Sequence, residues 1–198
     1  MSGALVWLLV ALGLGVVVVR RRSLAVTLVT AQALVLAVSA AQDTAAPAIV
    51  LAIRAVALGA LLLLVVSRTR EPRPVRAGIA PIARAGLAVG FALALTWLVP
   101  SIGLESRTAE RGVLALIAFG ITAAATRRAT LFQVMGIVLC ENGLALAALA
   151  LPVGSSTAIE LGVAFDLTLV AVVAAVFHEK IFAEFGAGDT AALRSLRD

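Results

Sequence analysis

Seven long apolar runs, separated by short polar breaks, constrain this chain more than any other feature of its sequence. A helix of about 20 apolar residues crosses the hydrocarbon core of a bilayer, and about 17 are enough. Strands with open edges would leave backbone groups unpaired in lipid, so each run is expected to be a helix. The expected spans are 4–19, 24–41, 46–66, 78–99, 113–125 (starting nearer Thr108), 129–151 and 157–177. The predicted fold class is therefore all-α, a polytopic membrane bundle of about seven transmembrane helices.

The composition agrees with a membrane protein and argues against nucleic-acid binding. Hydrophobic residues make up 62% of the 198 residues and charged residues 14%, whereas a soluble domain carries about 25% charged residues. The arginines behind the net charge of +5 lie mostly between the apolar runs, where they meet lipid headgroups. Aromatic residues, which would stack on bases, are only 5% of the chain. Membrane lipid is thus an expected partner and nucleic acid is not.

The distribution of basic residues predicts the orientation of the chain. If the N-terminus is outside, only Arg107 and Arg111 fall in outer loops, and twelve basic residues fall on the cytoplasmic side. Cytoplasmic loops carry an excess of Lys and Arg, so the N-terminus is expected outside and the C-terminus in the cytoplasm. The cytoplasmic residues are Arg20, Arg21, Arg22, Arg68, Arg70, Arg73, Arg76, Arg127, Arg128, Lys180, Arg194 and Arg197.

The breaks between the runs divide the chain into three expected parts. Residues 1–106 form an N-terminal four-helix membrane part, and residues 107–177 form a three-helix part. Residues 178–198 form a mildly amphipathic cytoplasmic tail, which either lies on the membrane surface or docks a neighbouring subunit.

Five ionisable residues fall inside the expected spans, where each costs about 2.5–3.5 kcal/mol on insertion scales. Such residues are kept for pairing, for a water path or for a substrate. Glu141 and Asp166 lie at similar mid-membrane heights, about 18 and 17 Å from the same side, on consecutive antiparallel helices. Glu160 lies nearer the outer face. The five are Arg54, Arg84, Glu141, Glu160 and Asp166.

The functional interpretation of the three acids is a proton relay. A carboxyl buried in apolar surroundings holds its proton more readily than one in water, and a nearby cation reverses this preference. The alternative is a satisfied polar contact between helices, with Asn142 or Gln133 as the partner of Glu141. Arg54 is too deep to reach the surface and is expected to pair with a carboxylate, whereas Arg84 can snorkel to the cytoplasmic surface and is interpreted as structural.

Other features of the sequence point to packing. Gly86 and Gly90 form a GxxxG pattern, which predicts a close helix contact in the fourth span. The single cysteine, Cys140, is interpreted as a small core residue, and the single histidine, His178, as an interfacial one. The sequence contains no P-loop, HExxH or GxSxG motif, so catalytic and metal-ligating residues are not expected in this chain.

The last three spans resemble a known family. The stretch Arg127–Leu146, with paired arginines, a Leu-Phe, a Gly and an Asn before an apolar run, resembles the K subunit of respiratory complex I. Val138 stands where that subunit carries its first membrane glutamate, and Glu141 lies one turn further on. Three motifs resemble more closely the E subunit of hydrogenase-4 type membrane complexes, which include formate hydrogenlyase relatives: Glu141-Asn142-Gly143, Glu160-Leu161-Gly162 with Asp166, and Asp189-Thr190 with Leu193 and Leu196.

This resemblance implies a non-catalytic membrane-arm subunit of an oxidoreductase complex in the prokaryotic plasma membrane. The complex would be a hetero-oligomer of antiporter-like membrane subunits and a soluble redox arm. The chain itself would hold no cofactor, and nickel–iron and iron–sulfur centres would belong to the partner subunits. Redox energy would drive protons or sodium along a polar axis to which Glu141 and Asp166 contribute. The alternatives are a subunit of a multisubunit cation/proton antiporter without a redox partner, or a non-conducting scaffold subunit.

Overall fold

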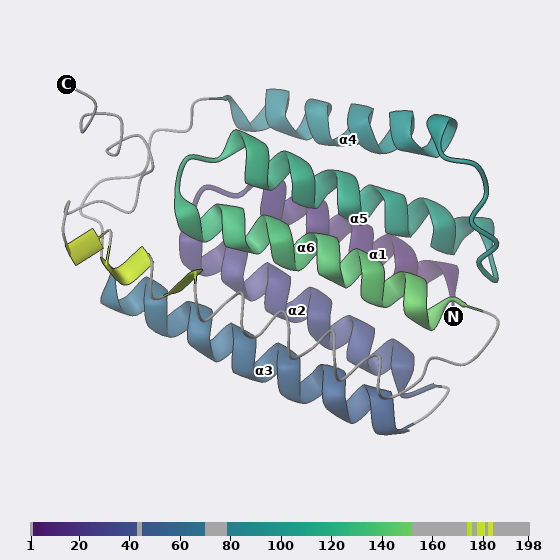
Figure 1. The fold of residues 1–198 in the computed structure, drawn as a ribbon, viewed down its shortest axis with the longest axis horizontal. Coiled ribbons are helices and arrows are strands. Elements are labelled where there is room, and N and C mark those ends of the chain that lie inside the picture. Colours follow the sequence, from purple (N-terminus) through teal and green to yellow (C-terminus); the bar gives the residue numbers. More distant parts are fainter. Residues whose placement is uncertain are drawn as a thin grey trace.

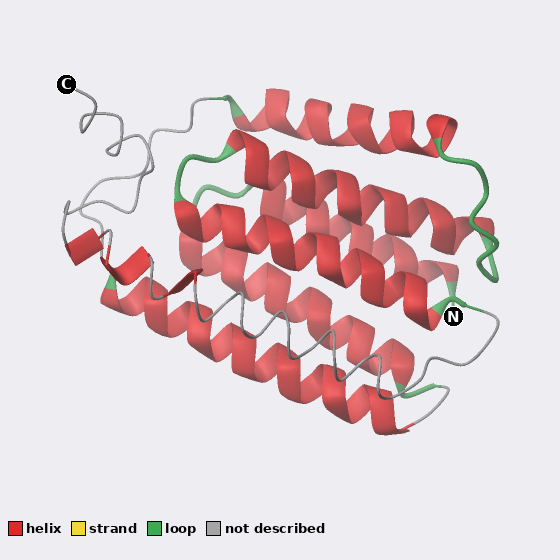
Figure 2. Cartoon of the chain, in the orientation of Figure 1, coloured by secondary structure: helices red, strands yellow, loops and turns green. Residues whose placement is uncertain are grey.

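The computed structural model describes residues 2–42, 45–69, 79–151, 174–175, 178–180 and 182–183. Within these residues the chain forms helices and loops, and no strand is drawn (Figure 2). The long helices are α1 (Gly3–Val18), α2 (Arg22–Ala40), α3 (Ala45–Arg68), α4 (Pro81–Leu98), α5 (Arg107–Thr126) and α6 (Thr130–Leu149). They lie side by side in one elongated bundle, with α4 at one edge and α3 at the opposite edge (Figure 1).

The first six expected spans correspond to these six helices. The fifth helix begins at Arg107 because the Ser106 side chain caps it, accepting a hydrogen bond from the Ala109 N–H at 3.1 Å. The fourth begins at Pro81 rather than at residue 78, since proline is favoured in the first turn, where no helical N–H bond is needed. The seventh expected span lies almost entirely outside the described residues, as do Glu160 and Asp166.

Five of the helices, α2 to α6, are long and apolar enough to cross a membrane, and α1, with 16 residues, is shorter. Their number suggests a multi-pass membrane protein. The edge helix α4 buries only a narrow face, formed by Arg84, Ala88 and Ala92. The remaining surface of α4 is apolar and exposed, as expected of a helix that meets lipid.

The backbones of α5 and α6 come into direct contact where the two helices cross. A Cβ atom added to Gly120 would lie 2.5 Å from the Gly136 carbonyl oxygen, and one added to Gly136 would lie 2.6 Å from the Gly120 carbonyl oxygen. The two backbones therefore touch at a point where only glycine fits. The expectation of a close contact at Gly86 and Gly90 is wrong for the described part of the chain, because a Cβ atom added to either residue would meet no heavy atom within 4 Å.

The helices alternate in direction, so the connections collect at two ends of the bundle (Figure 1). The ends of α1, α3 and α5 lie together with the starts of α2, α4 and α6, and this end carries Arg20–Arg22, Arg68 and Arg127–Arg128. The opposite end carries the α4–α5 connection with Arg107 and Arg111. The fold thus separates a strongly basic end, called here the arginine-rich end, from a less basic one.

Candidate intramembrane polar site

A buried ion pair joins α3 to α6. The Nη2 atom of Arg54 lies 2.8 Å from Oε2 of Glu141, and the two side chains are only 5% and 9% exposed. Arg54 lies about 21 Å, and Glu141 about 17 Å, along their helices from the arginine-rich end, so both are near mid-length. The two side chains meet beside α2, which packs against both α3 and α6. The pair therefore brings together two of the ionisable residues that the sequence places deep in the spans.

A second set of buried polar contacts begins at the residue after Glu141 and crosses the bundle. The next residue, Asn142, donates from Nδ2 to Oε1 of Gln32 at 2.8 Å. Gln32 in turn donates from Nε2 to the Leu9 carbonyl oxygen at 2.8 Å. Gly13 makes room for this contact, since a Cβ there would lie 3.0 Å from the Gln32 amide nitrogen. All of these bonds lie inside the protein, where a polar group without a partner would be costly.

The ion pair and the amide contacts meet at adjacent positions of α6, and the two sets together, from Arg54 on α3 to Leu9 on α1, are called here the polar line. Gln32 lies about 15 Å and Leu9 about 14 Å from the arginine-rich ends of their helices. The whole line thus falls within about 14 to 21 Å of that end. It runs across the helices at one depth rather than along them, and in a bilayer it would lie close to the membrane plane.

Arg84 occupies a different environment from the one expected. It does not extend to the surface, because its side chain is fully buried. Its Nη1 donates to the Val17 carbonyl oxygen and its Nη2 to the Ile79 carbonyl oxygen, both at 2.9 Å. Val17 belongs to the last turn of α1, where carbonyl groups lack helical partners and the helix dipole is negative. Arg84 therefore ties α4 to the end of α1.

Arg127 binds the same helix end. From the α5–α6 connection its Nη2 donates to the carbonyl oxygens of Val17, at 2.9 Å, and Val19. Its guanidinium carbon lies 4.0 Å from the centre of the Phe132 ring. Burial, with repulsion from Arg84 and Arg20, lowers the pKa of Arg127 to about 10. Arg127 is still charged at neutral pH, and the carbonyl groups of α1 stabilise that charge.

The predicted site residues lie in different parts of the molecule. Arg54 and Glu141 meet, Arg84 lies at the arginine-rich end, and Glu160 and Asp166 lie outside the described residues. Of the two amides considered as partners of Glu141, Asn142 binds Gln32, and Gln133 donates to the Arg127 carbonyl oxygen at 3.1 Å.

Gln32 and the buried position of Arg127 were not predicted from the sequence. A usable signal for Gln32 was present, since it is an amide near the middle of an otherwise mainly apolar run. Amides in such runs form hydrogen bonds to neighbouring helices. No comparable signal marks Arg127, which looks like an ordinary arginine of a polar loop until the folded chain brings α1 beside it.

Comparison with known proteins does not add to this geometry: no protein-family description, no curated protein and no solved structure matches the chain. The polar line and the motifs around Glu141 are therefore the features that bear on the role of the site. What the described residues establish is an all-helical bundle of membrane-spanning character with a buried charge pair near its middle.

Proposed function

We propose that this chain is a membrane-arm subunit of a redox-driven, proton- or sodium-translocating complex of the hydrogenase-4 and complex I type. The observation that carries the proposal is the ion pair of Arg54 and Glu141, 2.8 Å long and buried near mid-length of two apolar helices. Ionisable residues at such depth are costly, and they mark ion pathways and proton relays. The Glu141-Asn142-Gly143 motif, which resembles that of the hydrogenase-4 E subunit, contains the acid of this pair.

In the proposed mechanism Glu141 is the group that carries the proton. While the Arg54 guanidinium lies within ion-pair distance, the carboxylate form of Glu141 is stabilised. When Arg54 moves away, the buried carboxylate takes up a proton from the pathway, and the proton is released when the pair forms again. Arg54 keeps its own proton throughout, because a guanidinium does not deprotonate in proteins.

The amides of the polar line supply places for ordered water beside Glu141. The Oδ1 atom of Asn142 is buried and accepts no hydrogen bond from the described groups. A buried water typically satisfies such an atom and two or three further polar groups. Water at this position would extend the pathway sideways from Glu141. Asp166 and Glu160, which lie outside the described residues, are proposed as further acids of the same pathway.

The proposed setting follows from charge and resemblance. The arginine-rich end faces the cytoplasm of a prokaryotic cell, which leaves the N-terminus outside, and a seventh span over 157–177 brings the C-terminus to the cytoplasm. The partners are antiporter-like membrane subunits and a soluble redox arm that carries nickel–iron and iron–sulfur centres. A second candidate function, a scaffold subunit, is favoured by the fact that the ion pair physically connects α3 to α6.

Purification of the tagged full-length chain in mild detergent, with mass spectrometry of the proteins that accompany it, tests the proposal. Recovery of antiporter-like subunits together with a redox arm is the expected result. Recovery of antiporter-like subunits without any redox protein would replace the proposal with a cation/proton antiporter complex. A stable, monodisperse chain recovered alone would contradict both.

A further inference from the structure

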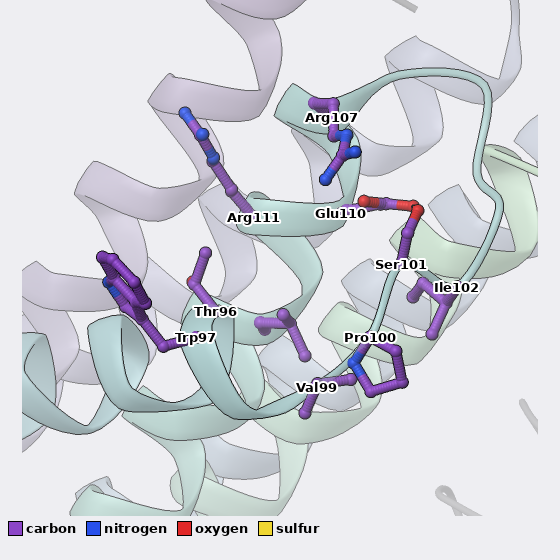
Figure 3. Close-up of a pocket in the computed structure, with 10 residues that line it drawn as sticks. Thr96, Trp97, Val99, Pro100, Ser101, Ile102, Arg107, Glu110 and Arg111 are labelled. Atoms are coloured by element: carbon purple, nitrogen blue, oxygen red, sulfur yellow. The ribbon is translucent and has the colours of Figure 1, made fainter.

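A pocket of about 300 Å³ lies at the end of the bundle opposite the arginine-rich end, between the C-terminus of α4 and the N-terminus of α5. Figure 3 shows Arg107 and Arg111 along one side of it, and Trp97, Val99 and Pro100 along the other. The pocket is remote from the polar line, which lies near mid-length of the helices. Its lining combines cationic and apolar groups, which the proposed function does not use.

The cationic side of the pocket has an excess of positive charge. Arg107 and Arg111 are exposed and one turn apart on α5, so they project from the same face of the helix. Neither guanidinium lies within ion-pair distance of a carboxylate in the described part of the chain, whose ion pairs are formed elsewhere. The N-terminus of α5, which begins at Arg107, adds the positive end of the helix dipole.

The one carboxylate in the lining, Glu110, is already engaged. Its Oε1 atom accepts a hydrogen bond from the Ser101 hydroxyl at 2.6 Å and another from the Gly103 N–H at 3.0 Å. Gly103 has φ of +74°, a conformation that favours glycine and brings its N–H to the carboxylate. Glu110 therefore holds the α4–α5 connection in place. The pocket carries two cations against this single anion.

The apolar side of the pocket continues onto the outer surface of the edge helix. Trp97 is 89% exposed and Leu98 78% exposed, and both end α4 where it borders the pocket. Tryptophan and arginine are typical of the level at which headgroups meet acyl chains. A molecule in this pocket would thus have an anionic part beside α5 and an apolar part beside Trp97.

We infer that this pocket binds an anionic phospholipid, with Arg107 and Arg111 on the phosphate and Trp97 against the glycerol and upper acyl chain. Free phosphate would use only the cationic side. A zwitterionic lipid would gain less from a pocket with excess positive charge, because its ammonium group would meet two guanidinium groups. The bound lipid would hold α4, which buries only a narrow face against the other described helices.

Fluorescence quenching of Trp97 by lipids with brominated acyl chains tests this inference. The full-length chain is prepared in mild detergent with Trp7→Phe, which leaves Trp97 as the single tryptophan. Brominated phosphatidylglycerol is expected to reach half-maximal quenching at a mole fraction about fivefold lower than brominated phosphatidylethanolamine. Equal quenching by the two lipids would overturn the inference.

Three variants and one competitor make the result specific. Arg107→Gln with Arg111→Gln is expected to abolish the preference, whereas Arg107→Lys with Arg111→Lys keeps most of it because the charges remain. Arg20→Gln with Arg21→Gln removes two charges at the other end of the bundle and is expected to leave the preference unchanged. Persistence of the preference in the double glutamine variant, with circular dichroism showing a folded chain, would refute the assignment. Relief of quenching by millimolar inorganic phosphate alone would show that the pocket binds phosphate, and would overturn its assignment to a phospholipid.

Discussion

Arg54 and Arg84 are both buried arginines inside apolar helices, yet the protein stabilises their charges in different ways. Arg54, near mid-length of α3, meets the carboxylate of Glu141. Arg84, in the first turns of α4, meets carbonyl oxygens of Val17 and Ile79. Carbonyl groups without helical partners occur at the ends of helices and in the connections between them, so an arginine near an end can use backbone. An arginine at mid-length lacks this option and requires an acid.

The two contacts differ in whether the acceptor can take up a proton. A carbonyl oxygen does not titrate, so the contacts of Arg84 are expected to be permanent and structural. A carboxylate does titrate, so the contact of Arg54 with Glu141 has two chemical states. The structure thus gives a physical reason why the deeper pair, and not the arginines around α1, is the candidate for proton transfer.

Removing one member of the deep pair should give the largest effect. Glu141→Gln leaves a buried guanidinium that cannot lose its charge, and should lower the free energy of unfolding by about 3–5 kcal/mol. Arg54→Gln should cost less, because Glu141 can become neutral by taking a proton. Unfolding of the full-length chain in mixed detergent micelles, followed by circular dichroism, measures both. A larger loss for Arg54→Gln would contradict this account of the pair.

At the arginine-rich end, single substitutions should have a smaller effect. Arg84→Leu should cost about 1.5–3 kcal/mol, because hydrogen bonds to a charged donor are lost while Arg127 still donates to the Val17 carbonyl oxygen. Arg127→Leu should behave similarly. The double variant should cost more than the sum of the two, since both donors to one carbonyl are then absent. If the losses of unfolding free energy of the two single variants simply add in the same measurement, the shared Val17 carbonyl contributes nothing to the coupling between Arg84 and Arg127.

Neutralising both members of the deep pair should restore most of the stability. Arg54→Gln with Glu141→Gln is expected to cost about 1 kcal/mol, because replacing both ions avoids a lone buried charge. The double variant would then be more stable than Glu141→Gln alone. A double-mutant cycle checks this, and the absence of any coupling energy would mean that the two side chains do not depend on each other.

The smallest effect concerns repulsion among the arginines around α1. Arg20 lowers the pKa of Arg127, so Arg20→Gln should stabilise the chain by about 0.5 kcal/mol at low salt and by less at high salt. Because the folded-state pKa of Arg127 is about 10 and thus below its ordinary value, its charge costs stability at any lower pH. That cost is relieved only as the pH rises above about 10, so the gain should be constant between pH 6 and 8. A marked pH dependence in that range would point to another group.

The helices were largely predictable from the sequence, and their contacts were not. Arginines and prolines between the apolar runs mark most helix ends, so six expected spans correspond to α1–α6. Helix packing was harder to predict, because a pattern such as Gly86 and Gly90 fits either a close contact or an exposed face. The glycines that do allow close contact, Gly120 and Gly136, belong to different helices, and no spacing along the chain relates them.

In the candidate site, too, the need for a partner was predictable from the sequence, and the identity of that partner was not. Burial depth was enough to predict that Arg54 needs a carboxylate, because a lone charge in an apolar span is too costly. The identity of its partner depends on which helices lie beside α2, which one sequence does not reveal. The expected reach of Arg84 to the surface was wrong, because snorkelling was considered and the free carbonyl groups of α1 were not. Those carbonyl groups come within reach only when α1 and α4 pack together.

Proton translocation by the assembled complex that carries Arg54→Gln with Glu141→Gln would show whether the ion pair belongs to the proton pathway. Acidification of inverted membrane vesicles would be followed with a pH-sensitive dye and normalised to the rate of electron transfer, with Arg20→Gln as the control variant. The double variant is expected to assemble with its partner subunits but to translocate no protons above background. Assembly with proton translocation equal to that of the unmodified complex would contradict it, and would show that the ion pair only holds α3 to α6.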